Sequence, residues 1–209
     1  MVAGTDEASN APRRIGIMGG TFDPLHNGHL ACATAAQETL DLDEVLFIPC
    51  GGPSFKQETV SASAEDRLAM TRLGVAGHPA FSVDDLEIER AGTTYTVDTL
   101  HELHERYPEA ELVFITGADA ARTLPLWYSA DELGRLAQFA VVARDGESLS
   151  AADQRKLADA GFTIIMLADV QTGDVSSHEI RSLAKRGEPF GTLVPEAIER
   201  YIIENELYR

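Results

Sequence analysis

Two histidines stand three residues apart in Gly19–His29, GGTFDPLHNGH, directly after a short apolar run. The run predicts a strand, so His26 and His29 are expected at and just inside the start of the following helix. Unpaired N–H groups and the helix dipole favour an anion there, and imidazole can donate to a phosphate oxygen. The first two glycines allow close approach of a ligand, and Gly28 leaves room for the anion. The other interpretation is a turn with two helix-capping histidines, but the whole string between a strand and a helix favours phosphate binding.

A second cluster lies near the end of the chain in Ser176–Arg181, SSHEIR. Ser176 followed three residues later by Glu179 is typical of a capping box, with Arg181 as a solvated side chain. Alternatively, two hydroxyls and a guanidinium surround a helix start and form a second phosphate site. The residues alone do not separate these two interpretations. If the second holds, both helix starts are expected to converge on one triphosphate.

Weaker candidates follow other predicted elements. Asp119 comes after the apolar run 112–115, where a carboxylate could accept from ribose hydroxyls or cap a helix. Trp127, the single tryptophan, is by itself more typical of a core residue. His101 and His104 could share a metal, but their neighbours indicate a solvated helix face.

The elements that position these residues alternate between strands and helices. Apolar runs predict strands at 14–18, 44–49, 81–88, 111–116, 138–143 and 163–167, and helices at 29–40, 63–75, 95–107, 177–185 and 195–204. The acids at 84, 85, 87 and 89 alternate along the third strand and are expected to face water. This order predicts an α/β, Rossmann-like, doubly wound and mostly parallel sheet with helices on both faces. Ligands then bind beyond the carboxyl ends of the strands.

Composition limits the kind of protein. A formal net charge of −17 argues against a nucleic-acid partner, since a polyanion would be repelled. No window approaches the ~20 apolar residues of a membrane helix. The two cysteines, in no CxxC arrangement, indicate reduced thiols and a cytoplasmic protein. We expect a disordered leader at 1–12 and one domain at 13–209 with C-terminal helices. The sequence leaves the oligomeric state open, a homo-oligomer included.

The motif at 20–29 resembles the GxFxPxHxGH signature of the nucleotidyltransferase superfamily. Within it the chain, from about residue 14 onward, most resembles the bacterial nicotinate-nucleotide adenylyltransferases. The segment 176–181 is similar to their SSTxIR motif, with His178 in place of Thr. The segment 93–100 is similar to their (S/T)YTxDTL motif, and 144–146 to an Arg-Pro-Gly segment, with Asp145 in place of Pro.

This resemblance implies a role for each matching residue. It implies catalytic roles for His26, His29 and Arg181. It implies ATP binding by Gly19, Gly20, Thr21, Phe22, Gly28, Gly117, Asp119, Ser176 and Ser177. It implies mononucleotide binding by Lys56, Thr94, Tyr95, Trp127 and Arg144, with Trp127 stacking on the pyridine ring.

The implied reaction joins the AMP half of ATP to nicotinate mononucleotide, giving deamido-NAD and pyrophosphate in NAD biosynthesis. Its expected partners are these two nucleotides, with Mg²⁺ held by the phosphates and water rather than by a carboxylate cage. Two alternatives stay open. One is adenylyl transfer to nicotinamide mononucleotide or phosphopantetheine, and the other is a non-catalytic nucleotide-binding module.

Overall fold

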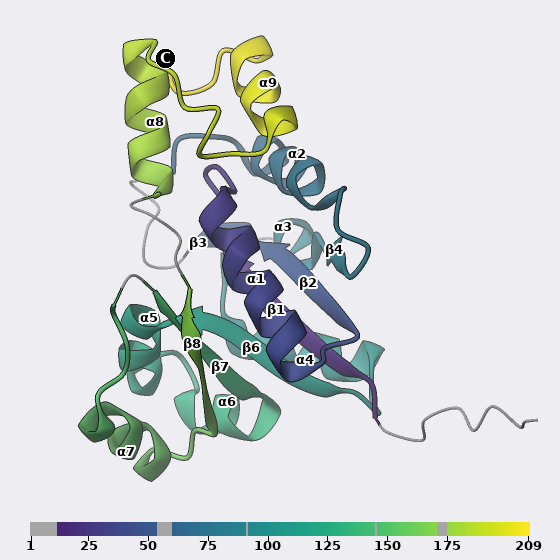
Figure 1. Cartoon of the computed structure of the whole chain (residues 1–209). Coiled ribbons are helices and arrows are strands. Elements are labelled where there is room, and N and C mark those ends of the chain that lie inside the picture. Colours follow the sequence, from purple (N-terminus) through teal and green to yellow (C-terminus); the bar gives the residue numbers. More distant parts are fainter. Residues whose placement is uncertain (1–11, 54–59, 91, 145, 171–174) are drawn as a thin grey trace, which may run out of the picture.

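A computed structural model describes residues 12–53, 60–90, 92–144, 146–170 and 175–209 (Figure 1). Its main sheet has six strands in the order β4-β2-β1-β6-β7-β8, and each neighbouring pair is parallel. These strands are β1 (Arg14–Gly20), β2 (Glu44–Pro49), β4 (Phe81–Val83), β6 (Glu111–Gly117), β7 (Gln138–Arg144) and β8 (Ile164–Val170). Two short strands, β3 (Gly52–Pro53) and β5 (Thr93–Thr94), form a separate parallel pair.

Helices cover both faces of the main sheet. They are α1 (Asn27–Leu40), α2 (Ala64–Val75), α3 (Leu86–Glu89), α4 (Thr96–Arg106), α5 (Ala118–Thr123), α6 (Ala130–Leu136), α7 (Ala151–Asp159), α8 (Ser177–Arg186) and α9 (Glu196–Glu204), with a 3-10 turn η2 (Leu124–Leu126). Buried side chains of α1, α2, α8 and α9 belong to one core cluster, and those of α3 to α7 to the other. None of the described helices is long and apolar enough to cross a membrane.

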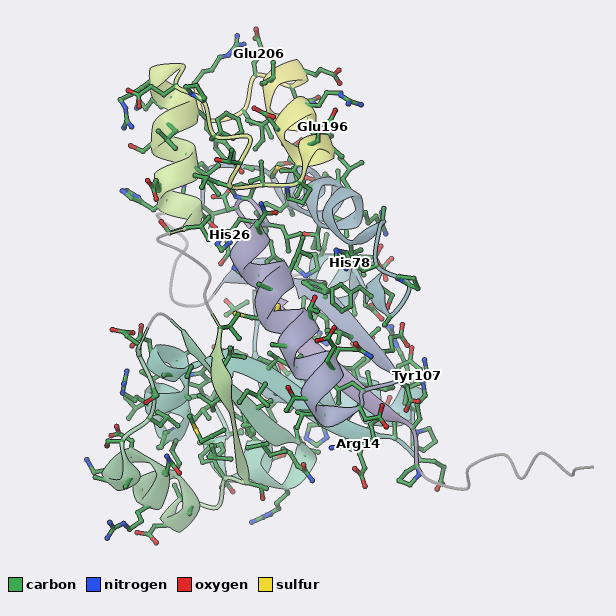
Figure 2. The ribbon with its side chains drawn as sticks, in the orientation of Figure 1. Arg14, His26, His78, Tyr107, Glu196 and Glu206 are labelled. Carbon is green, nitrogen blue, oxygen red and sulfur yellow. The ribbon has the colours of Figure 1, made fainter. Side chains whose placement is uncertain are left out.

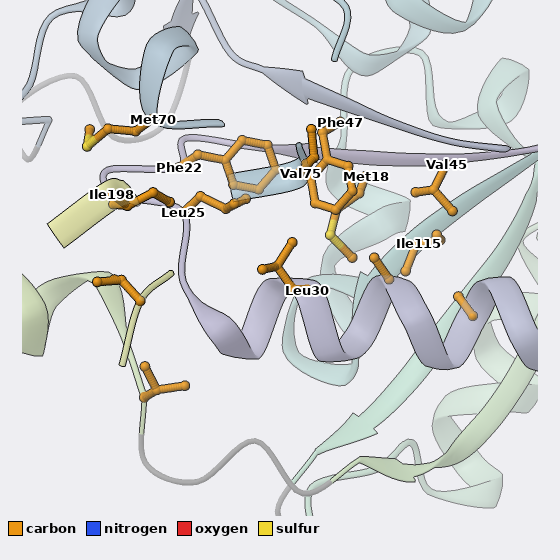
Figure 3. Packing of buried hydrophobic residues seen from close by; sticks show 14 of the residues in the cluster. Met18, Phe22, Leu25, Leu30, Val45, Phe47, Met70, Val75, Ile115 and Ile198 are labelled. Atoms are coloured by element: carbon orange, nitrogen blue, oxygen red, sulfur yellow. The ribbon is translucent and has the colours of Figure 1, made fainter. Parts of the chain in front are cut away.

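Alternation along the strands builds these two cores. In β2, Val45 and Phe47 enter the first cluster, whereas Leu46 and Ile48 enter the second, and all four are at most 3% exposed. Each such side chain contributes about 1.5–3 kcal/mol through burial. Figure 3 shows Phe47 in the first cluster. The predicted doubly wound α/β fold is therefore confirmed.

The strand order reverses between β1 and β6. β1 pairs with β2 on one side and with β6 on the other, so the connections leave the sheet centre in opposite directions. In doubly wound sheets this switch point, at the carboxyl ends of the strands, is where ligands bind. Gly20 ends β1 and Gly117 ends β6, so both predicted glycine segments lie at this switch point.

The structure corrects one predicted strand. The strand predicted at 81–88 ends at Val83, and α3 begins three residues later. Asp84 accounts for the change, because its Oδ1 accepts the Leu86 N–H at 3.0 Å and turns the chain out of the sheet. The short helices α5, α6 and α7 were not predicted. The predicted leader, residues 1–12, lies outside the described residues except for Pro12, and the single-domain organisation stays a prediction.

The alternating pattern predicted that Glu87 faces water, but its side chain is buried. It is 9% exposed, and its Oε1 accepts the Thr99 hydroxyl at 2.7 Å. Burial raises the pKa of the Glu87 carboxyl, and hydrogen bonds from Thr99 and Thr94 oppose the rise. The alternation failed here because α3 turns this side chain inward.

We predict that Glu87→Gln removes part of the pH dependence of stability. With its folded pKa raised, Glu87 favours the folded state at low pH and loses that contribution as pH rises. The free energy of unfolding of Glu87→Gln relative to the unmodified chain should therefore increase from about pH 4 to about pH 7. Urea unfolding across this range measures it, with exposed Glu89→Gln as the control. A difference that stays constant with pH would contradict the prediction.

Candidate functional site

The two motif histidines lie at the start of α1, below α8, as Figure 2 shows for His26. His26 is the N-cap and His29 the third helical residue, so their predicted placement is confirmed. Their rings stack with centroids 3.7 Å apart, and the His26 N–H donates to His29 Nδ1 at 3.3 Å. A neutral imidazole that accepts at Nδ1 carries its proton on Nε2. His29 therefore combines a capping role with an N–H donor.

A cleft of about 340 Å³ opens at the switch point. It is lined by residues from β1, α1, β6 and α5, among them Gly19, Gly28, His29, Gly117 and Asp119. The structure thus brings five of the predicted ATP-binding and catalytic residues to one cavity. Asp119 is exposed, and its Oδ1 accepts from Arg122 at 2.7 Å.

Gly28 lines the cleft, and its neighbours also leave no room for a side chain at this position. A Cβ at this position would lie 2.9 Å from Val175 Cγ1 and 3.1 Å from His26 Cε1. Both distances are too short for an unshifted side chain. The space that we assigned to an anion at Gly28 is therefore filled in part by Val175, which precedes α8.

The start of α8 contacts the loop that precedes α1. Ser177 donates its hydroxyl to the Pro24 carbonyl at 2.9 Å, and Arg181 Nη1 donates to the Asp23 carbonyl at 2.7 Å. Ser176 is the N-cap of α8 and accepts the Glu179 N–H at 3.2 Å. Both serine hydroxyls thus make structural hydrogen bonds, and the two helix starts meet at residues 23–28.

Arg181 lines a second cleft, of about 540 Å³, rather than the one that holds His29. The described residues around this second cleft are neutral or basic: Ser61, His178, Arg181, Ser182, Lys185, Tyr208 and Arg209. Arg209 forms an ion pair with Glu206. On a chain of net charge −17, this is a local cationic surface next to the motif loop. A nucleotide that contacts both His29 and Arg181 has to extend from one cleft toward the other.

The predicted pyridine-binding residues lie against one core cluster. Thr94 is buried in β5, and the ring of Tyr95, the N-cap of α4, is tilted by 33° against the Tyr128 ring, with centroids 4.5 Å apart. Trp127 packs edge-on against Phe114 and donates its Nε1–H to a threonine hydroxyl. Tyr128, which is 59% exposed, was not singled out by the sequence.

Several predicted residues have little or no structural description. Lys56 and Asp145 lie outside the described residues, and only the backbone of Arg144, at the end of β7, is described. His101 lies within 3.0 Å of Glu132, and His104 within 2.7 Å of the Leu136 carbonyl. Within the described ranges, no three His, Cys, Asp or Glu side chains cluster as a metal site.

Arg67 of α2 links two of the loops at the site. It is 1% exposed and donates to the Thr21 carbonyl at 2.8 Å and to the Gly51 carbonyl at 3.2 Å. These carbonyls belong to the loops after β1 and β2. Sequence analysis missed Arg67, although its spacing places it on the face of α2 that Met70 and Gly74 bury.

Comparison with known proteins identifies the family. Residues 17–183 match the cytidylyltransferase-like family model. The chain is 45% identical over 201 residues to a probable nicotinate-nucleotide adenylyltransferase of Corynebacterium kroppenstedtii, covering 96% of this chain and 93% of the relative. A protein of the same name from Desulfitobacterium hafniense is 45% identical over 200 residues, with 95% and 97% covered. The chain belongs to the nicotinate-nucleotide adenylyltransferase family.

Solved structures support the fold of this family member. The chain resembles Plasmodium falciparum nicotinic acid mononucleotide adenylyltransferase complexed with APC, with a TM-score of 0.76 and 20% identity. The match covers 94% of this chain and 97% of that one. The same enzyme complexed with NaAD gives a TM-score of 0.75. At this identity the likeness establishes the fold alone.

We predict that Arg67→Met lowers the free energy of unfolding by about 3 kcal/mol, because two loop carbonyls lose a charged donor. Arg72→Met is the matched control on the same helix, where the ion pair with Asp85 is exposed and its loss should cost less than about 1 kcal/mol. Urea denaturation measures both. If both variants lost the same free energy of unfolding, the buried hydrogen bonds of Arg67 would stabilise the fold no more than an exposed ion pair does.

Proposed function

We propose that the cleft at the switch point binds ATP. The protein then transfers the AMP part of ATP to nicotinate mononucleotide and releases deamido-NAD and pyrophosphate. The observation that carries this proposal is the contact between the starts of α1 and α8 at residues 23–28. Two helix N-termini beside one loop, with imidazoles on one and a cationic cleft beside the other, suit a triphosphate.

The chemistry needs charge stabilisation rather than a general base. A 5′-phosphate oxygen of the mononucleotide attacks the α-phosphorus of ATP. The bond from the α-phosphorus to the oxygen bridging to the β-phosphate breaks, and pyrophosphate leaves with that electron pair. The attacking phosphate is already an anion near neutral pH, so no proton has to be removed. Catalysis therefore comes from positioning and from hydrogen-bond donors at the developing charge.

The residues around the helix starts divide these tasks. His26 and His29 stabilise the triphosphate, and Arg181 and the backbone N–H of Ser177 at the start of α8 bind its outer phosphates. Gly19, Gly20, Thr21, Phe22, Gly28, Gly117 and Ser176 shape the ATP site. Asp119 accepts from the ribose. Lys185, four residues after Arg181 in the second cleft, is a further cation for the outer phosphates.

Magnesium fits this site only as a companion of ATP. The described residues offer no cluster of three ligands, and the two carboxylates that line the cleft, Asp119 and Glu147, are both exposed. Mg²⁺ would then be held by phosphate oxygens and water, which it keeps readily, and would neutralise charge on the triphosphate.

The mononucleotide site lies toward Thr94, Tyr95 and Trp127. We assign the pyridine ring to these aromatic residues, and its phosphate to Lys56 and Arg144. A flat ring can stack on an indole or a phenol. Tyr128, whose ring lies against that of Tyr95, extends the same aromatic surface.

The decisive experiment is pyrophosphate release from ATP with each candidate acceptor. We expect turnover with nicotinate mononucleotide, and lower kcat/KM with nicotinamide mononucleotide and with phosphopantetheine. Preference for either of the other acceptors would reject the assigned substrate. ATP binding without pyrophosphate release with any acceptor would favour a non-catalytic module.

We predict that His29→Ala lowers kcat by roughly two to three powers of ten, as for the loss of a transition-state donor. The cap bond from the His26 N–H is lost as well, so thermal denaturation has to show that the fold survives. His101→Ala, which removes an exposed histidine of α4, is the matched control and should keep its turnover. Near-normal turnover of His29→Ala would refute its role.

A further inference from the structure

Asp23, inside the histidine motif, is a buried carboxylate to which the sequence analysis assigned no role. It is 2% exposed. Its Oδ2 accepts the Ser61 N–H at 2.8 Å, and its Oδ1 accepts the Ala62 N–H at 3.1 Å and the Tyr208 hydroxyl at 2.8 Å. A buried carboxylate is costly unless donors replace its lost water. These three bonds therefore hold Asp23 in one orientation.

The same residue holds Arg181. Arg181 Nη1 donates to the Asp23 carbonyl at 2.7 Å and lies 3.8 Å from its Oδ2. The carboxylate is thus close to the guanidinium without a hydrogen bond to it. A phosphate that binds Arg181 must compete with this carboxylate for the same positive charge. How far Asp23 turns toward Arg181 then sets how strongly the guanidinium binds an anion.

Tyr208 is the side-chain donor that opposes such a turn. The turn after α9 sends it back to the motif loop, with positive φ values of 54° at Glu206 and 66° at Tyr208. Non-glycine residues adopt this region rarely, so the surrounding contacts must impose it. Burial, and then the Asp23 carboxylate, raise the pKa of Tyr208, so its hydroxyl keeps its proton and remains a donor.

We propose that Tyr208 is a positioning residue for ATP: its hydroxyl holds the Asp23 carboxylate away from Arg181 and so leaves the guanidinium available to phosphate. This inference rests on the proposed role of Arg181 in ATP binding. Without the hydroxyl, one oxygen of a buried carboxylate loses its strongest neutral donor. Arg181, whose Nη1 lies 3.8 Å from the other carboxylate oxygen, would then pair more closely with Asp23 and less with ATP.

The test compares Tyr208→Phe with Tyr201→Phe. Tyr201 on α9 also donates its hydroxyl to a carboxylate at 2.9 Å, but this carboxylate is Asp66 of α2 and not Asp23 of the motif loop. We expect Tyr208→Phe to raise the KM for ATP roughly fivefold to tenfold, the usual range for one hydrogen bond, with kcat and the KM for the mononucleotide nearly unchanged. Tyr201→Phe should leave all three constants unchanged.

A double-mutant cycle with Arg181→Lys shows whether the effect passes through Arg181. If it does, Tyr208→Phe adds little to the KM for ATP once Arg181 is replaced. Additive effects, an unchanged KM for ATP, or equal increases in both KM values would overturn the proposal. So would a Tyr208→Phe protein far less heat-stable than Tyr201→Phe, since the bond would then be structural. Failure of the proposed function can be told apart from failure of this inference, because in the first case the unmodified chain itself would release no pyrophosphate.

Discussion

The site depends on keeping the buried polar groups of the loop between β1 and α1 hydrogen-bonded. This loop runs from the end of a central strand to the start of a helix. Its carbonyls and the Asp23 carboxylate therefore lack the regular backbone donors of a sheet or a helix and need other hydrogen-bond donors. Arg67 of α2 binds the Thr21 carbonyl, and α8 binds the carbonyls of Asp23 and Pro24. Two distant helices are therefore fixed to one loop, which lies between the cleft that His29 lines and the cleft that Arg181 lines.

The chain and its nucleotide substrates both carry negative charge, and donors close to the site offset their repulsion. A net charge of −17 would repel nucleotides at long range, but at physiological salt charges are screened beyond about 8 Å. Within that distance the helix starts present N–H groups and imidazoles, and α8 presents Arg181 and Lys185. In the proposed function, phosphate binding is decided by a few oriented donors, which have to outweigh the two carboxylates that line the cleft, Asp119 and Glu147.

Buried polar residues also connect the cleft proposed for ATP to the predicted mononucleotide site. Arg67 joins the loops after β1 and β2 through the Thr21 and Gly51 carbonyls. The Glu87 backbone lies against Gly51, where a Cβ would come within 2.0 Å of its carbonyl oxygen. The Glu87 side chain in turn accepts from Thr99 of α4, the helix that Tyr95 caps. The two substrate regions therefore share one continuous packed framework.

Features whose partners are close along the chain could be predicted from the amino-acid sequence. Strand and helix periods gave the doubly wound sheet, and spacings of three residues gave the starts of α1 and α8, because such contacts are fixed by local geometry. The same local patterns failed at Asp84, where a side-chain bond ended β4, and at Glu87, which α3 turned inward. The roles of Lys56 and Arg144 stay predictions. The position of Arg181 in a second cleft and the contact of Tyr208 with Asp23, 185 residues away, became visible only in the folded chain. No periodicity encodes such a contact, since it depends on how packing brings the end of the chain back to the loop.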